Sequence, residues 1–374
     1  MSENDKPPIY PFILTGHNAR GRRITDVVEA TTGDAAVQAF ADRGLSDIVL
    51  HTDDIAAPFL NYSKATLRPR DAVWARTHGP FQLSLFVTRY VLMKFWYLLL
   101  LPVGWLLYVL IRAQEWDFWN LVTLAAASFA ILFIVGFVLW SFLRYARLLR
   151  AAGWARWDEV LRLLPRLSKS IMPKYEWPIR KAQALAGAGR LPQALAEFNA
   201  AWEFDELPEY VYWVFRAVVS LAAQDSDGAV DCFARAHELA PETPIVLVDY
   251  ATVLLKERRD TRRARPLLAE ARRHAISDTT LPYLLAAEGM LALEEGRPAD
   301  AVGPLTESLR KADPFLRGNP SIIVVGARIR AYLCLALAAT GDTTAARRHL
   351  QRARPLLIAH QSRDLIDRCE QAVG

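Results

Sequence analysis

The sequence predicts a mainly α-helical protein, an α-solenoid of stacked helix pairs preceded by a two-helix transmembrane hairpin and a small amino-terminal ββαβ module. Three observations predict this. Two long apolar runs lie near residue 120, a pattern of small and large apolar residues recurs through the second half, and short strand-like segments flank a helix near the start. The predicted units are a disordered tail (1–8), an α/β module (9–54), a linker (55–89), two transmembrane helices (90–112 and 121–143) with a short extracytoplasmic loop (113–120), a helical cap (144–174) and the solenoid (175–374).

Composition favours a membrane protein with a large part outside the bilayer. Hydrophobic residues make up 52% of the 374 residues, and the net charge of +5 is mild for this length, so we expect no nucleic-acid partner. Cys232, Cys334 and Cys369 are far apart and have no His at metal-ligand spacing. That indicates a reducing compartment and buried thiols, without a metal site or disulfide framework. The opening residues MSENDKPPIY are polar, and we expect no signal peptide.

Two uncharged runs are long enough to cross a membrane. Residues 95–111 number 17 and residues 121–143 number 23, and roughly 17 to 25 apolar residues span the hydrocarbon layer. The alternative is a pair of helices buried in a large soluble core. Tryptophans near the ends of both runs favour the membrane instead, because Trp concentrates at bilayer interfaces.

Basic residues lie on the outer sides of the two predicted spans. The approach to the first carries Arg76, Arg89 and Lys94, whereas the loop has only Arg112 against Glu115 and Asp117. Basic residues also follow the second span: Arg144, Arg147, Arg150, Arg156 and Arg162. By the positive-inside rule, both termini are expected in the cytoplasm at a bacterial inner membrane.

The amino-terminal module is predicted as β-β-α-β. YPFILTG and ITDVVEATT read as strands, GDAAVQAFADRG as a helix and LSDIVLHTDD as a third strand. The stretch resembles the small domain ahead of the membrane helices in platform proteins of type II secretion and type IV pilus systems. That resemblance implies a docking module. It rests on an aromatic first strand, an A-x-G turn (Ala19, Gly21), a V-x-A strand (Val28, Ala30), an A-x-x-x-F helix and a G-L pair before the last strand (Gly44, Leu45).

Three further segments connect or close these units. The linker 55–89 lacks a clear period and contains Pro58, Pro69 and Pro80, so we expect it to lie near the membrane surface. The sequence LRYARLLRAAGWARWDEVLRLLPRL continues the second span into a helical pair with Gly153 at the turn. After the last repeat, PLLIAHQSRDLIDRCEQA supplies a capping helix.

Five repeat units follow, with spacings of 35, 35, 37 and 45 residues. In each unit a small residue precedes a large apolar residue by four positions, and a second small residue follows three later. The triplets are Ala194, Phe198, Ala201; Ala229, Phe233, Ala236; Ala264, Leu268, Ala271; Ala301, Leu305, Ser308; and Ala346, Leu350, Ala353. Small residues allow helices to cross closely, and the large residue fills the gap between them.

These units resemble the tetratricopeptide repeat (TPR), which implies antiparallel helix pairs. The second unit matches best, through Trp213, Ala217, Ala229, Phe233, Ala236 and Pro241. Three features depart from the pattern: the third unit lacks its proline, Ser308 replaces an alanine, and PFLRGNPSII is inserted before the fifth unit. The insertion either bends the solenoid or forms its own loop.

The TPR resemblance implies that first helices line a groove for a protein partner. The predicted groove residues are Gln183, Val211, Val214, Val218, Asp249, Val253, Lys256, Tyr283, Met290 and Arg328. The Lys/Asn clamp for carboxylates found in chaperone-binding members is absent. A mixed, largely apolar groove favours an amphipathic helix or an extended segment as ligand.

A basic cluster on one hairpin is the second candidate surface. Arg258, Arg259, Arg262 and Arg263 either form a solvated convex face or contact anionic lipid or an acidic partner. GAGR at 187–190 reads as an inter-helix turn rather than a phosphate loop. His237, His274 and His349 read as surface residues.

No catalytic motif or cofactor fingerprint appears in the sequence. We therefore expect no enzyme, cofactor or metal, but a scaffold in contact with the lipid bilayer that recruits a protein to an envelope assembly such as a secretion or pilus system. The alternative is an accessory subunit of a membrane-associated biosynthetic enzyme complex. Homo-oligomer formation stays open.

Overall fold

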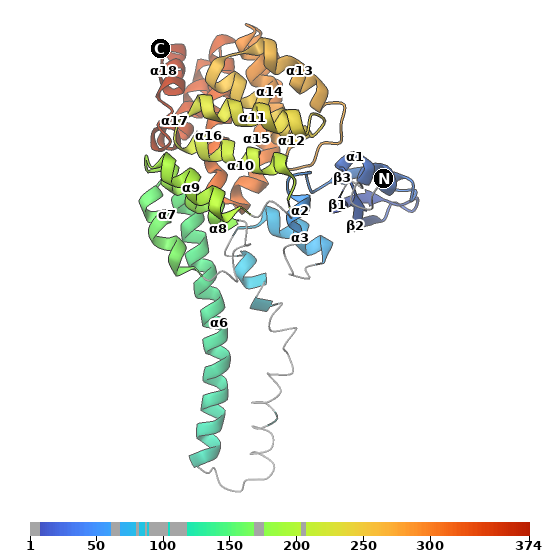
Figure 1. Ribbon diagram of the computed structural model, residues 1–374, viewed down its shortest axis with the longest axis vertical. Helices are drawn as coiled ribbons and strands as arrows, with labels where there is room; N and C mark the ends of the chain where they lie inside the picture. The colour runs from blue at the N-terminus through green and yellow to red at the C-terminus, as the bar shows by residue number, and fades with distance from the viewer. Residues whose placement is uncertain are drawn as a thin grey trace.

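A computed structural model describes residues 8–60, 68–79, 82–86, 88–89, 104, 118–167, 176–202 and 207–374. It shows a helical solenoid, a small sheet beside it and one long helix that projects away from both (Figure 1). The predicted tail, apart from residue 8, lies outside the described residues. So do the predicted first span, apart from Gly104, and residues 113–117 of the predicted loop.

The amino-terminal module has the predicted β-β-α-β order. It comprises β1 (Tyr10–His17), β2 (Arg23–Ala30), α1 (Gly33–Ala41) and β3 (Ser46–Leu50), and the antiparallel strands lie in the order β2-β1-β3. Phe12, Leu14 and Phe40 are fully buried and form its core. The Thr32 side chain caps α1 by accepting a hydrogen bond from Ala35 N.

The segment predicted as an unstructured linker contains helices. These are α2 (Ala57–Leu60) and α3 (Pro69–Thr77), and α3 contacts both the sheet and helix α15 (Pro298–Gly318). Pro69 stands at the start of α3, where its missing N–H costs nothing. Pro69 therefore marks a helix start, and α3 packs on the solenoid.

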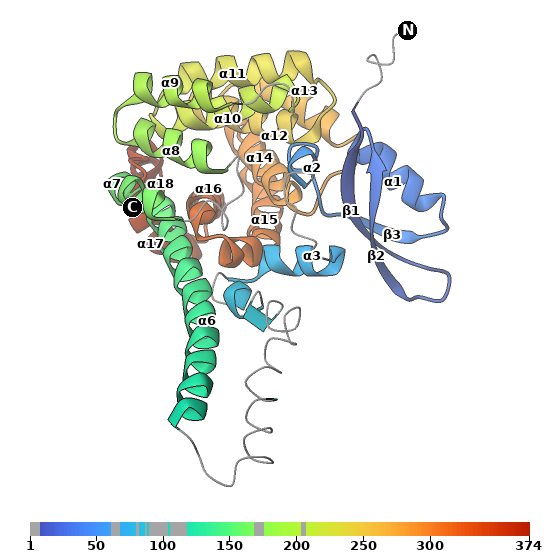
Figure 2. The same cartoon turned by 60° about the horizontal axis from the view of Figure 1, so that its bottom comes forward.

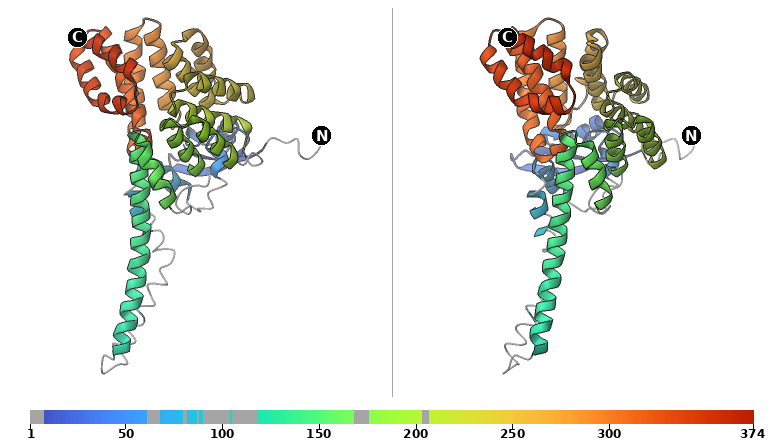
Figure 3. Two further views of the ribbon diagram at one scale, coloured as in Figure 1. Left: turned by 60° about the vertical axis from the view of Figure 1, so that its left-hand side comes forward. Right: turned by 90° about the vertical axis from the view of Figure 1, so that its left-hand side faces the viewer.

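Helix α6 (Phe118–Gly153) is 36 residues long and contains the predicted second span. Its outer part extends away from the rest of the molecule (Figures 1 and 3). Eight large hydrophobic side chains there are exposed: Trp119, Val122, Phe129, Leu132, Phe133, Phe137, Trp140 and Leu143. Its inner end is different, because Leu148 and Ala151 are buried among α7 (Trp157–Leu163) and α8 (Glu176–Gly187).

One stretch of the described residues, Pro320–Ala339, meets both the length and the hydropathy of a membrane span. It comprises the short helix η5 (Pro320–Ile322) and α16 (Ile323–Ala339), and 44% of it is buried. Length and hydropathy alone do not separate a span from a core helix, and this stretch lies in the solenoid.

Antiparallel helix pairs build the solenoid, as the repeat pattern predicts. Consecutive helices within each pair contact one another along their lengths. The pairs are α8 with α9 (Leu191–Ala201), α10 (Glu209–Ala222) with α11 (Ser226–Leu239), α12 (Pro244–Val253) with α13 (Thr261–Ala271), α14 (Leu281–Glu294) with α15, and α16 with α17 (Thr343–Ala359). The π-turn η4 (Leu254–Arg258) follows α12, and α18 (Arg363–Val373) closes the carboxy-terminal end.

The repeat residues occupy the core, with one exception. Every member of the five triplets is buried except Ala201, which is exposed at the end of α9. Ser308 replaces alanine without leaving a polar group unpaired, because its hydroxyl donates to the Pro282 carbonyl at 2.6 Å. A Cβ on Gly289 would lie 2.5 Å from Leu305 Cγ, so a glycine is needed where α14 crosses α15.

The insertion before the fifth unit is largely helical and does not form the separate loop that the sequence left open as one alternative. It lengthens α15 to 21 residues, and it forms η5, which packs against the inner end of α6. The cap predicted over 144–174 consists of the end of α6, then α7 and the short helix η2 (Leu164–Arg166), with Gly153 ending α6 as predicted. Residues 168–175 lie outside the described part.

Candidate functional site

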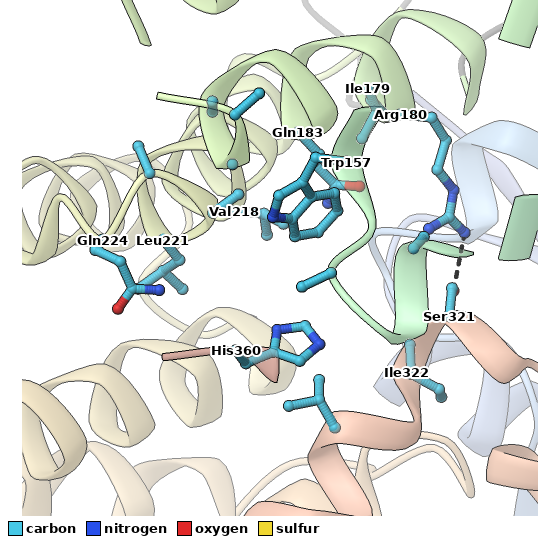
Figure 4. A pocket seen from close by; sticks show the side chains of 18 of the residues that line it. Trp157, Ile179, Arg180, Gln183, Val218, Leu221, Gln224, Ser321, Ile322 and His360 are labelled. Carbon is cyan, nitrogen blue, oxygen red and sulfur yellow. Dashed lines mark hydrogen bonds between the residues drawn. The ribbon is translucent and has the colours of Figure 1, made fainter. Parts of the chain in front are cut away.

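A cavity of about 760 Å³ lies inside the solenoid, where its first and last parts meet. Its walls come from the end of α6, α8, α10, η5, α16 and the turn after α17. Figure 4 shows the Trp157 and His360 rings next to each other among the lining residues, which also include Gln183 and Val218. Small-molecule sites commonly measure about 300–1,000 Å³, so this volume is sufficient for a ligand.

Contacts at Gly153 close the ring of helices around the cavity. The His360 Nε2 atom lies 3.0 Å from the Gly153 carbonyl oxygen, and the Trp157 and His360 rings meet edge-on at 6.2 Å. A Cβ on Gly153 would lie only 2.0 Å from the Pro320 carbonyl oxygen. A Cβ on Gly187 would similarly lie 2.3 Å from Trp157 Nε1. Both glycines thus permit close approaches that a larger residue would prevent.

Two charged side chains that line the cavity, Glu176 and Arg180, are paired with each other. Glu176 accepts hydrogen bonds from Tyr145 Oη at 2.9 Å and from Arg180 Nε at 3.0 Å. Arg180 also donates to Ser321 Oγ at 3.1 Å, the dashed line in Figure 4. These bonds join α6 and α8 to η5.

His360 is held neutral. Burial lowers its pKa, and the positive charges of Arg328 and Lys256 lower it further against the opposing hydrogen bond to the Gly153 carbonyl. A carbonyl only accepts, so the Nε2–H donates and Nδ1 is left as an acceptor. The cavity therefore offers a neutral ring there.

A segment of the chain itself occupies the inner face of the solenoid elsewhere. Ile55 is partly buried and packs against both main core clusters of the repeats. Tyr210 donates a hydrogen bond to the Asp54 carbonyl at 3.0 Å, and Thr279 donates to the Asp53 carboxylate at 3.3 Å. We call residues 53–56 the inserted segment, which is distinct from the insertion before the fifth repeat unit.

The amino-terminal module docks through the loop between α13 and α14. The Asp278 N–H donates to the Leu50 carbonyl at 2.8 Å, and its carboxylate lies 2.5 Å from His51 Nδ1. Asp34 at the start of α1 accepts from Ala275 N at 2.5 Å and lies 2.7 Å from His274 Nδ1. Figure 2 shows the sheet beside α12 and α14 with α2 between them. His274, predicted as a surface residue, is thus part of this interface.

Two acids at the interface have raised pKa values. Burial, together with the nearby Asp53 charge, raises the pKa of Asp249 to about 7. Burial raises the pKa of Asp54 to about 6, against the lowering effect of the Gly33 N–H that its carboxylate accepts at 2.8 Å. Both carboxyls are thus more readily protonated in the folded chain than in the unfolded one.

The predicted groove residues divide into three sets. Gln183, Val218 and Arg328 line the central cavity. Tyr283 lines a second cavity of about 380 Å³ together with Asp53, while Asp249 and Lys256 are half-buried. The remaining four face the core between helices, with at most 4% of their surface exposed, and this corrects their assignment to the groove: Val211, Val214, Val253 and Met290.

The predicted basic cluster is largely neutralised by acids from neighbouring helices. Arg258 pairs with Asp227, Arg259 lies 3.1 Å from Asp364, and Arg263 contacts both Asp260 and the Tyr250 hydroxyl. Within the described chain, no ion pair is recorded for the exposed Arg262. The surface therefore carries less free positive charge than the sequence indicates.

The sequence did not reveal the inserted segment or the role of His360. Both depend on contacts between residues more than 150 positions apart, for which a single sequence has no periodic signal. The sequence hint was that residues 51–54, His-Thr-Asp-Asp, are all polar and directly follow an apolar strand, which indicates that the stretch does more than end a strand.

Comparisons with known proteins give little further information. No family model matches the chain, and neither does any curated protein. Among solved structures, the chain is similar to one described as "Crystal structure of APC/C hetero-tetramer Cut9-Hcn1", at 14% sequence identity and a TM-score of 0.40 over 73% of this chain and 52% of that one. The chain thus spans about half the length of that protein.

Proposed function

We propose that this protein is a membrane-anchored scaffold whose solenoid binds a protein partner on the cytoplasmic side of a bacterial inner membrane. The exposed apolar surface of α6 is the single observation that carries the proposal. Its eight exposed large side chains extend over 25 residues, from 119 to 143, and the sequence carries no charge from 121 to 143. Such a surface is costly in water and favourable in a bilayer.

Helix α6 also explains how an anchor would position the solenoid. Its buried inner end contacts η5 and α7, so the span and the repeats share one continuous helix. Arg144, Arg147 and Arg150 follow the apolar part directly, which supports a cytoplasmic position for both termini.

The inserted segment supports protein binding by the inner face. That face already holds one irregular polypeptide segment through an apolar anchor, Ile55, and two hydrogen bonds from Tyr210 and Thr279. In the proposal, a partner segment of similar chemistry competes with it. The benefit of the membrane anchor is a raised local concentration of the partner.

The partner is proposed to belong to an envelope assembly such as a secretion or pilus system. The alternative role is that of an accessory subunit of a membrane-associated biosynthetic enzyme complex. Neither role requires a catalytic group or a cofactor in this chain.

Site-specific photo-crosslinking in intact cells tests the proposal. A benzoylphenylalanine in place of Tyr283 should crosslink mainly to the inserted segment of the same chain. With Ile55→Asp added, which places a charge where an apolar anchor packs, the intermolecular products should increase. Mass spectrometry of those products separates an envelope assembly from a biosynthetic enzyme.

Two controls accompany this experiment. Benzoylphenylalanine at Arg235, exposed on α11, should give no increase in intermolecular products. The control for Ile55→Asp is Ile358→Asp, which changes an exposed isoleucine on α17 and leaves the inserted segment intact. The absence of any intermolecular product, both with Ile55 unchanged and with Ile55→Asp, would refute protein binding by this face. Separately, a reporter fused after Gly374 that is active only outside the cytoplasm would refute the proposed topology.

A further inference from the structure

The central cavity has a mixed lining suited to an amphiphilic molecule. Ile179, Val218, Leu221 and Ile322 supply apolar surface (Figure 4), and polar groups stand among them: Gln183, Gln224, Arg180, His360 and Arg328. Ligand sites commonly combine a largely apolar wall with a few polar groups that fix orientation. The inserted segment is not part of this lining, so a ligand here would not need to displace it.

Among the residues that the structure describes, no acidic side chain directly contacts one cation of the cavity, Arg328. Arg180 is paired with Glu176, as described above. Arg328 lines the same cavity from α16, and its Nε has no hydrogen-bond partner in the described part of the chain although it is buried. Part of the Arg328 side chain keeps some accessible surface, because it faces the cavity.

The carboxylate of Glu257, whose charge acts on Arg328, is already engaged. Glu257 forms an ion pair with Lys256 and accepts a hydrogen bond from Ser226 Oγ at 2.6 Å. Burial lowers the pKa of Lys256, and the charge of Arg328 lowers it further. The pKa of Glu257 is lowered against the effect of burial, mainly by Lys256 and to a smaller extent by the charge of Arg328. Among the described residues, two cations therefore share one carboxylate, and a positive charge remains.

A buried, unpaired guanidinium is costly, and arginine does not lose its proton to relieve the cost. A carboxylate suits it best, because the planar fork of N–H donors can bind both carboxylate oxygens at once. We infer that the central cavity binds a small organic monocarboxylate with an apolar body, its carboxylate paired with Arg328 and its body against Ile179, Val218 and Leu221. This site goes beyond the proposed scaffold function and does not depend on it.

Isothermal titration of the full chain in detergent tests this inference with a matched pair of probes. The acid is 3-phenylpropionate, and its neutral isostere is 3-phenylpropionamide, so the two differ mainly in charge. The acid should bind saturably and raise the unfolding temperature, and the amide should bind at least tenfold more weakly. Arg328→Gln should reduce the affinity for the acid at least tenfold and leave that for the amide unchanged.

Arg348→Gln is the matched control, because Arg348 is exposed on α17 away from the cavity lining. It should bind the acid like the unchanged chain. If Arg328→Gln does not fold, Arg328→Lys keeps the charge without the planar fork and should bind the acid with intermediate affinity. Equal binding of acid and amide, no binding of the acid at millimolar concentration, or full affinity in the Arg328 variants would overturn the inference.

Discussion

Replacing Gly153 with alanine should disrupt the contact that closes the solenoid. The added Cβ would lie 2.0 Å from the Pro320 carbonyl oxygen and 3.1 Å from Ile323 Cγ1. The nearer obstacle is a backbone atom, so no side-chain rotation relieves it, and α6 or η5 must move. Overpacking of this kind costs about 1–3 kcal/mol.

Two smaller effects accompany the clash. The movement would stretch the 3.0 Å bond between His360 Nε2 and the Gly153 carbonyl, which contributes about 0.5–1.5 kcal/mol. Alanine regains up to about 1 kcal/mol of helix propensity over glycine. These two changes roughly cancel, and the net loss in the free energy of unfolding remains about 1–3 kcal/mol.

Urea unfolding of the full chain in detergent, followed by tryptophan fluorescence, measures this loss. Gly303→Ala is the matched control, since Gly303 is exposed in the helix α15 and a Cβ there meets no atom within 4 Å. That control should be up to about 1 kcal/mol more stable than the unchanged chain. If Gly153→Ala is as stable as Gly303→Ala, the reasoning about closure is refuted.

Three other outcomes are expected. Ser308→Ala removes the 2.6 Å hydrogen bond to the buried Pro282 carbonyl and should lower the free energy of unfolding by about 1 kcal/mol, seen as a lower urea midpoint; an unchanged midpoint would contradict the bond's role. The folded-state pKa of about 7 for Asp249 lies above its unfolded value of about 3.9, so the folded chain holds a proton that the unfolded chain releases. Stability should therefore fall as pH rises from about 4 to about 7 and level off above that. Asp249→Asn should reduce this slope and leave the part that Asp54, with its pKa of about 6, contributes; an unchanged slope in that variant would exclude Asp249 as a source. Leu132→Arg places a charge on the exposed face of α6 and should weaken membrane insertion by about 2.5–3.5 kcal/mol, so that carbonate extracts more protein than with Leu132→Phe; equal extraction would argue against a span there.

The repeat units and the amino-terminal module could be predicted from the sequence because their signals are local. A small residue, a large apolar residue and a second small residue recur within eight positions, and that spacing alone places Ala229, Phe233 and Ala236 on one buried helix face. The β-β-α-β order followed in the same way from alternation and a helix start at Gly33.

The site could be predicted only in part, because it depends on distant contacts. Gln183, Val218 and Arg328 were expected on the inner face and do line a cavity, but helix register alone could not show that Val214 and Met290 turn toward the core. The neutralisation of the basic cluster could not be predicted for the same reason, because Asp227 and Asp364 come from other helices.

The helical content of 55–89 was missed because its prolines were read as breaks. Pro69 in fact begins α3, whose backbone approaches the solenoid so closely that a Cβ on Gly318 would lie 2.3 Å from the Arg76 carbonyl oxygen. A proline at a helix start and a proline in a loop have the same local sequence signature. Only the packing partner distinguishes them.

Spin-label accessibility along α6 tests the membrane anchor most directly. A nitroxide at position 132, in full-length protein reconstituted into lipid vesicles, should be relaxed strongly by oxygen and weakly by a water-soluble nickel chelate. A nitroxide at Arg235 on α11 should show the reverse. If the label at position 132 is as accessible to the nickel chelate as the label at position 235, then α6 does not lie in the bilayer and the scaffold is not anchored as proposed.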